Sequence, residues 1–405
     1  MNNVIKRYYL IDHRVLFFFG YVFYLFTPYL VGVTNAFTGY PGMELYQGFF
    51  RLIPKGKLLQ YMLVTLSWLP AFYLGHLSFK LFVHHKKNLQ LFPATPTTRA
   101  VSYVALLLLL VLVVFAYLGR ASLLGGYGSY DVAARGKMST LLVIFNFFLL
   151  YQLLSTQKPS VFLVTGTILT ALLLLSMGGR MYVMQTFLIY LIYKTSFAAR
   201  RWQLSRIALV LFAGFVVGSF MGLWRMNTSF KWDRAAYSLL AEPVFTWFST
   251  STYLISNDIP VISIPWNFLT SFLNLIPNTI ISFKPYLVST GSMVKNYQNP
   301  LGADSVWSTI VINFGSAGSF LFIFIPGFML HLLRHLSERS RFWAVYYICV
   351  CGMLPFQFFR DGFYIIHKQL YFNFLLFPAI ILIVVRTMLL LQANYKAPLN
   401  KPHLH

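Results

Sequence analysis

The sequence is poor in charged residues, which make up only 10% of its 405 residues, and acidic residues are the scarcer kind. Nine Asp and Glu stand against 32 Lys and Arg, whereas hydrophobic residues account for 58% of the chain and the mean hydropathy is +0.66. No soluble domain needs so apolar a composition. The scarcity of charge therefore excludes a soluble fold and indicates that the solvent of this chain is a lipid bilayer.

Cysteine is scarce as well. Its only two occurrences, Cys349 and Cys351, lie two residues apart in one apolar segment, so that on a helix they point to different faces. This spacing predicts neither a disulfide nor a metal site. The sequence also shows no convincing internal repeat, no low-complexity tract and no separate soluble domain.

Long apolar segments dominate the chain instead, and ten of them are long enough to cross a bilayer. Because backbone polar groups in lipid must find their hydrogen-bond partners within the segment, we expect each to be a helix, and the fold to be an all-α polytopic membrane protein. No small-residue cleavage site follows the first segment, so it is predicted to be a retained helix and not a signal peptide. The predicted spans are residues 15–34, 58–79, 100–118, 138–155, 160–177, 181–197, 206–224, 306–330, 342–358 and 368–391.

The distribution of charge predicts the orientation. With a cytoplasmic N-terminus, 18 of the 32 Lys and Arg fall on inner segments, and seven of the nine acidic residues fall on outer ones. Basic clusters at residues 84–87, 200–201 and 334–341 all lie on the inner side. Since Lys and Arg favour the cytoplasmic side of a membrane, we expect both termini inside.

Residues 225–305 form the longest segment outside these helices, and the orientation places it on the outer face. It is charged yet too rich in aromatic and aliphatic residues to be disordered, and long loops in compact proteins are usually functional. The predicted organisation is a bundle of seven helices over residues 1–224, the outer loop over residues 225–305, and further helices with a short cytoplasmic tail over residues 306–405.

Proline is frequent in the outer loop and breaks long helices, so we expect short helices there, lying at the outer membrane interface. The prolines are Pro243, Pro260, Pro265, Pro277, Pro285 and Pro300. An alternative inserts residues 236–255 and 262–283 as two more spans. That alternative gives 12 crossings in place of ten and leaves both termini inside.

Basic residues on the predicted outer face come from at least four elements. Arg120 lies in the second outer loop, Arg180 in a very tight turn between two spans, Arg225 at the start of the long loop, and Arg360 in the last outer turn. A guanidinium group matches phosphate oxygens with two parallel hydrogen bonds and keeps its charge when partly desolvated. We therefore expect these arginines to converge on an anion.

Other outer residues complete the predicted substrate site. Lys284 adds a cation in the long loop, and on one helix Arg360, Tyr364 and His367 share a face because they are four and then three residues apart. Aromatic side chains beside polar groups suit the faces and hydroxyls of sugars. A lipid-linked sugar diphosphate fits this set, with phosphates at the rim, sugars in the outer loop and the lipid tail between helices.

One carboxylate on the outer face would act as general base towards an acceptor hydroxyl. The candidates are Glu242, Asp258, Asp304 and Asp361. A metal site is not predicted, because His367 is the only histidine on the outer face and the acidic residues are scattered. Arginine would then stabilise a pyrophosphate leaving group in the way that a divalent metal does elsewhere.

Two motifs resemble those of the Wzy-type O-antigen or oligosaccharide repeat-unit polymerases of bacteria. The first is Met177-Gly178-Gly179-Arg180, which opens an outer-to-inner helix, together with the large outer loop that begins after the next helix. The second is the small-residue run from Asn299 to Ser305, followed by a Phe-Gly-containing stretch from Asn313 to Gly318. The layout is similar over most of the chain. The family typically has Gly-Ser-Arg where this chain has Gly-Gly-Arg, which keeps the arginine.

The resemblance implies transfer of a growing glycan from undecaprenyl diphosphate to a new lipid-linked repeat unit, on the periplasmic side of the bacterial inner membrane. It implies a metal-independent membrane glycosyltransferase with no cofactor, active in the synthesis of O-antigen or a related surface polysaccharide. Arg180 and Arg225 match the outer-face arginines of the family, and Arg360 matches more loosely. The implied partners are the bilayer, the undecaprenyl-diphosphate-linked oligosaccharide and a chain-length regulator protein, and no nucleic acid.

Two alternatives share the predicted layout. An O-antigen ligase uses the same donor and transfers the glycan to lipid A core, but ligases of that type usually carry a histidine in the large outer loop, and residues 225–305 contain none. A flippase or other transporter of lipid-linked oligosaccharides tends to show repeated halves, and broken helices with charges near the middle of the membrane. In this chain the ionisable residues lie mostly at the ends of the spans, which favours chemistry at one face.

Overall fold

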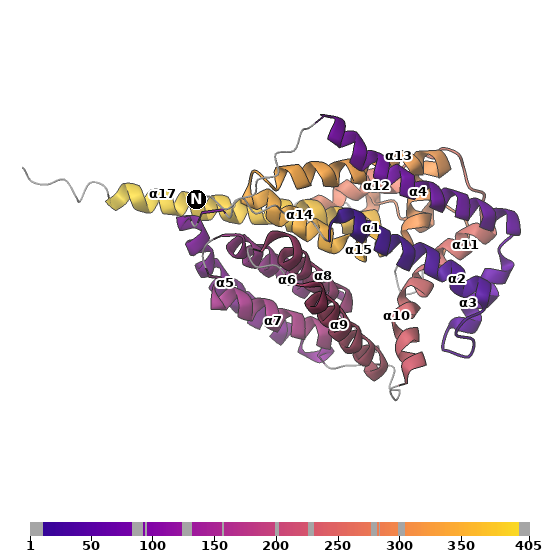
Figure 1. The fold of residues 1–405 in the computed structure, drawn as a ribbon, viewed down its shortest axis with the longest axis horizontal. Coiled ribbons are helices and arrows are strands. Elements are labelled where there is room, and N and C mark those ends of the chain that lie inside the picture. Colours follow the sequence, from indigo (N-terminus) through magenta and orange to yellow (C-terminus); the bar gives the residue numbers. More distant parts are fainter. Residues whose placement is uncertain are drawn as a thin grey trace, which may run out of the picture.

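The computed structural model is helical almost throughout (Figure 1). It describes residues 11–82, 92–93, 95–123, 132–155, 158–198, 202–225, 231–276, 282, 284–298 and 304–396. In these ranges no strand occurs, and the one extended pairing is an isolated bridge between Phe92 and Ser155.

The described part of the first half of the chain contains nine α-helices, two π-helical segments, η1 and η4, and one 3₁₀ turn, η2. In chain order they are α1 (His13–Tyr21), η1 (Val22–Phe26), α2 (Thr27–Thr34), α3 (Met43–Leu52), α4 (Lys55–Phe82), α5 (Pro96–Leu118), η2 (Arg120–Ser122), α6 (Val132–Leu153), α7 (Val161–Ser176), α8 (Arg180–Ile192), η4 (Tyr193–Phe197) and α9 (Leu204–Arg225).

The second half begins with short helices and ends with long ones, and its longest π-helical segment is η9. In chain order they are α10 (Trp232–Thr246), α11 (Phe248–Ser256), α12 (Trp266–Ser271), η5 (Phe272–Leu275), η6 (Lys284–Tyr286), η7 (Thr290–Ser292), α13 (Val306–Leu336), α14 (Arg341–Met353), α15 (Gln357–Arg360), α16 (Phe363–His367), η9 (Lys368–Leu376) and α17 (Phe377–Lys396). The last helix, α17, extends away from the others at the left of Figure 1.

Six of the described helical segments are long and apolar enough to cross a membrane. They are His13–Thr34, Lys55–Leu81, Pro96–Leu118, Ala134–Leu153, Val306–Leu336 and Phe363–Ala393, and three shorter apolar helices accompany them: Val161–Ser176, Ser205–Gly214 and Arg341–Met353. The chain is thus a helical membrane protein. Each of the ten predicted spans falls on a helix or on two or three consecutive helical segments, and the number of crossings and their direction stay predictions.

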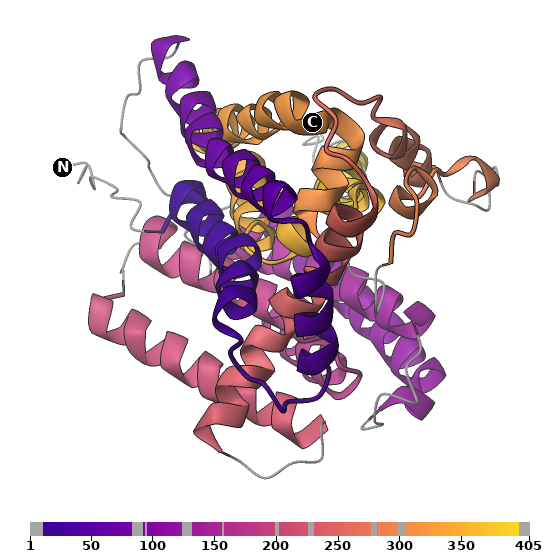
Figure 2. The same cartoon turned by 90° about the vertical axis from the view of Figure 1, so that its right-hand side faces the viewer.

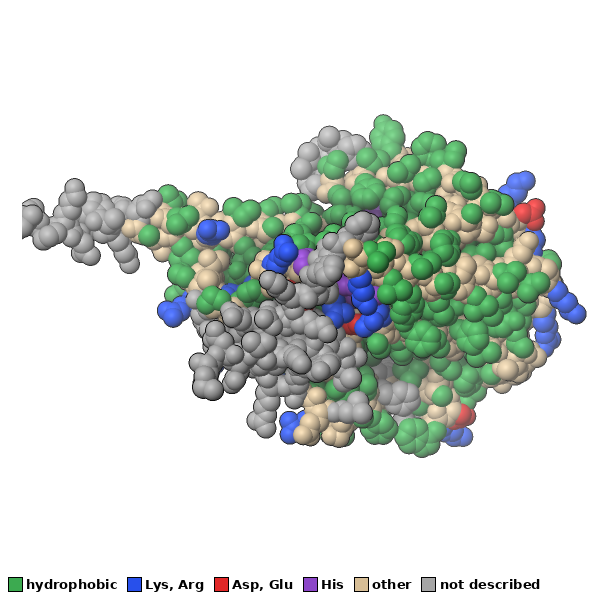
Figure 3. All heavy atoms as spheres, turned by 45° about the horizontal axis from the view of Figure 1, so that its top comes forward, with side chains coloured by type: hydrophobic (Ala, Val, Ile, Leu, Met, Phe, Trp, Pro, Cys, Tyr) green, Lys and Arg blue, Asp and Glu red, His purple; other side chains and the backbone are tan. Residues whose placement is uncertain are grey.

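Apolar side chains are exposed on the long helices, as a lipid-facing surface requires. On α5, Leu107, Leu110 and Val113 are each 60% exposed or more. In Figure 3, apolar side chains cover most of the visible face, with Lys and Arg near its ends and in one group upon it. The charged residues that the sequence does contain are therefore largely excluded from the apolar band.

The described part of residues 225–305 is divided into helical segments of at most 15 residues, as predicted, but Pro243 does not end one of them, because it lies inside α10. Residues 266–275 hold only the six-residue α12 and the four-residue η5, so no single helix covers the alternative span 262–283 in this part of the structure. Figure 2 shows the segment that carries α12 at the periphery of the molecule.

Helix α13 is broken at Gly315, whose φ of 75° and ψ of −178° are not helical. A Cβ added there would lie 2.5 Å from the carbonyl oxygen of Val261, so only glycine allows the outer loop to approach this closely. Beyond the break, the N–H groups of Ser316 and Ala317 donate to the carbonyls of Pro260 and Val261 at 2.8 and 3.0 Å. The outer loop therefore satisfies the backbone groups that the break exposes.

Candidate functional site

Arg360 lies between two carboxylates that are far apart in the sequence. Its Nε is 2.9 Å from Oε1 of Glu242, and its Nη1 is 3.4 Å from Oδ1 of Asp361. Nη1 also lies 3.4 Å from the sulfur of Met181, the second residue of α8. Among the described contacts of Arg360 none uses Nη2, whose two N–H groups could therefore serve a ligand.

Four elements bring this group together. Arg360 ends the short helix α15, Glu242 belongs to α10, and the backbone of Asp361 is extended, with φ of −99° and ψ of 148°. Tyr24, on the π-helical segment η1, donates to Oε1 of Glu242 at 3.5 Å, which is a long hydrogen bond. The side chains of Arg360, Glu242 and Asp361 are 20%, 31% and 5% exposed, so the cation and one carboxylate are largely withdrawn from solvent.

Burial also changes the protonation equilibria of the group. It raises the pKa of Asp361 above its ordinary value, although the nearby charge of Arg360 acts in the opposite direction. Burial lowers the pKa of Arg360 and the two carboxylates raise it, with a net rise, so this residue stays cationic. One cation thus faces two carboxylates, of which Asp361 takes up a proton more readily than an exposed aspartate does.

Asp304 is a third carboxylate close to this group. It is 7% exposed, and its Oδ1 accepts a hydrogen bond of 2.9 Å from the hydroxyl of Tyr297. Burial and the charge of Asp304 raise the pKa of Tyr297. A Cβ added to Gly362 would lie 3.2 Å from Oδ2 of Asp304. Asp304 and Asp361 therefore lie on either side of a glycine, and three of the four candidate carboxylates are found in one region. The fourth, Asp258, is exposed and pairs with Lys57 at 3.1 Å.

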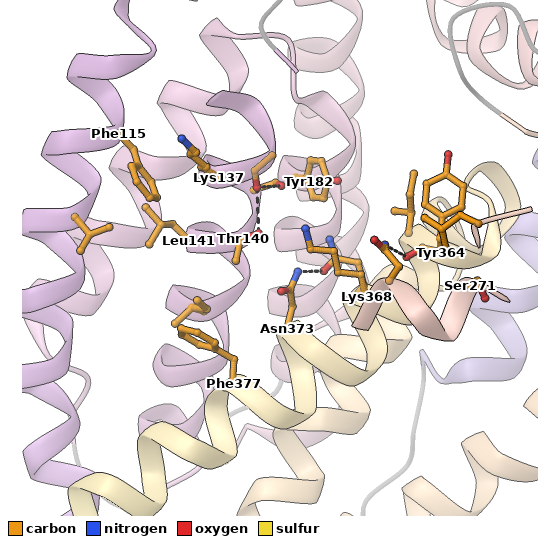
Figure 4. A pocket seen from close by; sticks show the side chains of 18 of the residues that line it. Phe115, Lys137, Thr140, Leu141, Tyr182, Ser271, Tyr364, Lys368, Asn373 and Phe377 are labelled. Carbon is orange, nitrogen blue, oxygen red and sulfur yellow. Dashed lines mark hydrogen bonds between the residues drawn. The ribbon is translucent and has the colours of Figure 1, made fainter. Parts of the chain in front are cut away.

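A cavity of about 1200 Å³ lies close to these residues, although Arg360, Glu242, Asp304 and Asp361 do not themselves line it. Tyr182 and Tyr364 both line it, and both interact electrostatically with Asp361. Figure 4 shows Lys137, Tyr182 and Lys368 around the cavity, from α6, α8 and η9. Its polar lining includes Lys137, Thr140, Asn267, Thr270, Asn274, Ser289, Tyr364, Lys368 and Asn373.

The remaining wall of the cavity is apolar. It comes from α5, α6 and α17, with Val104, Leu107, Leu108, Val111, Phe115, Leu141, Ile144, Phe377 and Ile381. From residue 104 to residue 115, α5 contributes a wall about 16 Å long, at the helical rise of 1.5 Å per residue. One cavity thus joins an apolar groove between membrane helices to two lysines and a set of hydroxyl and amide groups.

No described contact joins Arg120 or Arg180 to Arg360. The guanidinium of Arg120 lies 4.2 Å from the ring of Tyr117 and donates to its carbonyl at 3.3 Å. Arg180 opens α8 directly after a tight turn at Gly178, which has a φ of 84°, and so precedes the Met181 that contacts Arg360. Arg180 and Arg120 do not line the cavity.

Several predicted positions lie outside the described residues. These are the side chains of Arg225 and Lys284 and the motif residues 299–303. The backbone of Arg225 ends α9, and that of Lys284 begins the 3₁₀ turn η6.

The prediction that Arg360, Tyr364 and His367 share one helical face is wrong. The extended backbone at Asp361 separates α15 from α16, so that Arg360 does not belong to the helix of the other two. Tyr364 is 40% exposed and lines the cavity, whereas His367 is buried and bonds through Nδ1 to the hydroxyl of Ser271 at 2.7 Å. His367 also stacks on Phe272 with 4.1 Å between ring centres, an arrangement typical of packing.

The sequence did not single out Lys137, Lys368, Tyr24 or Tyr182, which the structure adds to the site. The two lysines follow candidate residues closely in the sequence: Lys137 ends the predicted second outer loop, and Lys368 comes directly after His367. Their position at an outer helix end was the only available signal. Nothing in the local pattern of Tyr24 or Tyr182 distinguishes them from the other 24 tyrosines.

Comparisons with protein-family models, with curated proteins and with solved structures find no match to this chain. In the described residues no group of three or more His, Cys, Asp or Glu side chains is arranged to hold a metal ion. The function is therefore argued from the residues of the site alone.

Proposed function

We propose that this chain transfers a glycan from undecaprenyl diphosphate to a hydroxyl of a second lipid-linked saccharide, at the outer face of the bacterial inner membrane. The observation that carries the proposal is the position of Arg360, between Glu242 and Asp361 and next to a cavity with an apolar groove and two lysines. An ordinary buried ion pair would explain the charges but not the amphipathic cavity beside them. A lipid-linked sugar diphosphate suits both.

The substrate would lie with its isoprenoid chain along α5 and α17, and its phosphates near Lys137 and Lys368. Lysine binds phosphate as a point charge, and both lysine side chains are exposed. The sugar next to the diphosphate would then approach Tyr182, Tyr364 and the carboxylates. In this proposal Lys137 of α6 and Lys368 of η9 bind the phosphates, the role that the sequence predicted for Arg120 and Arg180.

In the proposed reaction the acceptor oxygen bonds to the anomeric carbon of the donor sugar, and the bond from that carbon to the diphosphate oxygen breaks. A carboxylate takes the hydroxyl proton as general base. Glu242 suits this role best among the three, because it is 31% exposed, whereas Asp361 and Asp304 are 5% and 7% exposed. The diphosphate leaves with the electron pair, and Nη2 of Arg360 and the lysines stabilise its charge.

The break in α13 favours a second candidate, a transporter of lipid-linked saccharides, since broken helices are common in transporters. The third possibility from the sequence, a ligase, has no new observation in its favour. Experiments in cells can distinguish both alternatives from the proposed polymerase, by whether single repeats, long chains or neither reach the surface.

The test replaces Arg360 by Ala and Glu242 by Gln in cells that depend on this chain for a surface polysaccharide. Removing a charge-stabilising donor from an active site typically lowers the rate by a factor of about 100 or more, so long glycan chains should disappear while single repeats still reach the surface. Arg339→Ala serves as control, because this exposed arginine lies outside the site. Immunoblots must show equal amounts of each variant in the membrane.

Two outcomes would contradict the proposal. Wild-type amounts of long chains in both Arg360→Ala and Glu242→Gln cells would remove these residues from the chemistry. Loss of single repeats together with long chains, at normal protein levels, would indicate transport and not polymerisation.

A further inference from the structure

Three buried histidines meet at the ends of three membrane helices, away from the cavity. His13 opens α1, His76 lies near the end of α4, and His331 lies near the end of α13. They are 0%, 1% and 1% exposed. His13 lies about 16 Å along α1 and η1 from Tyr24 of the Arg360 group, by the helical rise per residue. The proposed glycan transfer makes no use of them.

Hydrogen bonds connect the three rings. Nε2 of His13 lies 3.0 Å from Nδ1 of His76, and Nδ1 of His13 lies 2.9 Å from the hydroxyl of Tyr347 on α14. Nδ1 of His331 lies 2.7 Å from the backbone carbonyl of His76. A carbonyl only accepts, so Nδ1 of His331 carries a hydrogen. The contact between His13 and His76 contains a single hydrogen, because one of the two nitrogens must accept.

The rings of His76 and His331 are stacked, with 4.0 Å between their centres and 17° between their planes. This stack lies at the closest contact between α4 and α13. A Cβ added to Gly75 would lie 2.1 Å from the carbonyl oxygen of Phe324, and a Cβ added to Gly327 would lie 2.1 Å from that of Phe72. The two backbones touch here, so a force between the rings acts directly on the contact between the helices.

The charged surroundings of the histidines are mostly positive. Among the described interactions of these histidines the one carboxylate is Asp12, which already pairs with Arg14 at 2.7 Å and with Arg334 at 3.4 Å. Its side chain is fully buried, and although burial raises its pKa, hydrogen bonding to Arg14 and the nearby charges lower it overall. The titratable and charged groups that interact with the histidines in the described residues are Asp12, Arg14, Lys80, Arg334 and Tyr347. Tyr73 and Cys351 interact in turn with Arg14 and Asp12.

We propose that His13, His76 and His331 form a buried proton-binding site, which holds α4 against α13 while it is neutral and weakens their contact when it is protonated. When all three rings are neutral, His13 and His76 share a hydrogen bond, and the stacked rings of His76 and His331 carry no charge. One further proton places an imidazolium beside Arg14, Arg334 and Lys80. A second proton has one of two effects. If His76 and His331 are both protonated, two cations lie 4.0 Å apart across the α4–α13 contact. If His13 and His76 are both protonated, two N–H groups face each other.

One buried nitrogen already marks where a proton would enter. Nε2 of His76 has no hydrogen-bond partner, although it is shielded from solvent. Buried polar atoms are nearly always paired, so an unpaired one in a histidine cluster needs a role. Burial beside Arg14, Arg334 and Lys80 opposes protonation of these rings while α4 and α13 are in contact, so acidification favours the state in which that contact is weakened. The site would therefore respond to acidification on the side of the membrane where α1 begins.

The test measures thermal unfolding of the full chain in lipid nanodiscs, by tryptophan fluorescence, from pH 5 to pH 8. The double variant His76→Asn, His331→Asn keeps a side-chain amide near each Nδ1 but cannot take up a proton. The wild type should melt several degrees lower at pH 5 than at pH 7.5, and the double variant should lose that difference. The control His335→Asn, at the same end of α13, should keep it. Equal pH profiles in the wild type and the folded double variant would overturn the proposal.

A second measurement does not depend on the variants. NMR spectra of wild-type protein labelled with ¹⁵N-histidine should show, over the same pH range, an imidazole that gains a proton and that a paramagnetic agent in solution does not reach. If every histidine that titrates is accessible to that agent, the buried site does not exist. Neither measurement uses glycan transfer, so this inference stands or falls separately from the proposed function.

Discussion

At the scale of single residues, one arginine in the outer region contacts two carboxylates. Arg360 holds Glu242 from α10 and Asp361 from its own segment, and both contacts are partly withdrawn from solvent. Removing the arginine would leave two partly buried carboxylates without a cation, which is costly. The group therefore fixes α10 against the turn between α15 and α16, whatever reaction it serves.

Replacing Asp361 by Asn should raise the stability of the protein at neutral pH. Burial raises the pKa of this carboxyl above its ordinary value, so the folded chain binds the proton more tightly than the unfolded chain. Stability then falls as pH rises from the ordinary value of 3.8 through the raised pKa, and stays lower above it. Asn does not ionise, so the difference in melting temperature between the variant and the wild type should grow in favour of the variant over that interval.

Asp233→Asn is the control with the opposite sign. A hydrogen bond from Tyr40 lowers the pKa of exposed Asp233, so its ionised form favours the folded state and that contribution is lost only as pH falls. The Asp233 variant should gain no stability at neutral pH. If Asp361→Asn is instead less stable than the wild type throughout, the ion pair with Arg360 outweighs the cost of burial.

The residue types of the site could be predicted from the sequence, but their grouping could not. Arg360, Glu242, Asp304 and Asp361 were candidates because each is charged and lies outside the apolar spans. Glu242 and Arg360 are separated by more than a hundred residues, and no local period relates them. The error over Arg360, Tyr364 and His367 has the same origin, because spacing implies a shared face only if the helix continues through Asp361.

At the scale of the elements, the contact between α4 and α13 depends on glycines. Gly327→Ala should lower the free energy of unfolding by roughly 1–3 kcal/mol, because the added methyl would meet the carbonyl of Phe72 and force the helices apart. The matched control is Gly56→Ala in α4, where a Cβ meets nothing within 4 Å. Ala is favoured over Gly within a helix by about 1 kcal/mol, so the control should be neutral or stabilising.

Denaturation of both variants in nanodiscs would measure these effects. A Gly327→Ala variant as stable as the Gly56→Ala variant would show that α4 and α13 separate easily, and would also weaken the case for a pH-dependent contact at His76 and His331. A loss confined to the Gly327 variant would confirm that the two backbones touch.

The apolar helices were predicted well, because the length and composition of a segment are enough to predict them. Features that depend on contacts with another segment of the chain were predicted poorly. Each predicted span lies on helical structure because lipid demands that a long apolar segment bond to itself. The break in α13 could not be predicted from the Gly315 motif alone, since the partners of Ser316 and Ala317 come from Pro260 and Val261 in the outer loop. The π-helical turns, such as the nine-residue η9 beside the cavity, likewise have no marker in the sequence.

At the scale of the whole molecule, two polar groups lie at different heights in the same apolar helices. The Arg360 group adjoins the first span at Tyr24 in η1, and the histidines adjoin its beginning. Both groups contact α1 or η1, and α13 runs from Ser305, next to Asp304, to the region of His331. The orientation of the chain in the membrane therefore decides which of the two groups faces the cytoplasm.

Cysteine labelling would test the predicted orientation, in which residues 225–305 face outward. Ser292 in η7 and Gln203 just before α9 are both exposed, and the prediction places them on opposite sides of the membrane. The native Cys349 and Cys351 are free but fully buried, so they add little background. In right-side-out vesicles an impermeant maleimide should label Ser292→Cys at once, and Gln203→Cys only after the membrane is permeabilised. The reverse pattern would put Arg360 and the cavity on the cytoplasmic side, where the proposed transfer between periplasmic lipid-linked saccharides could not occur.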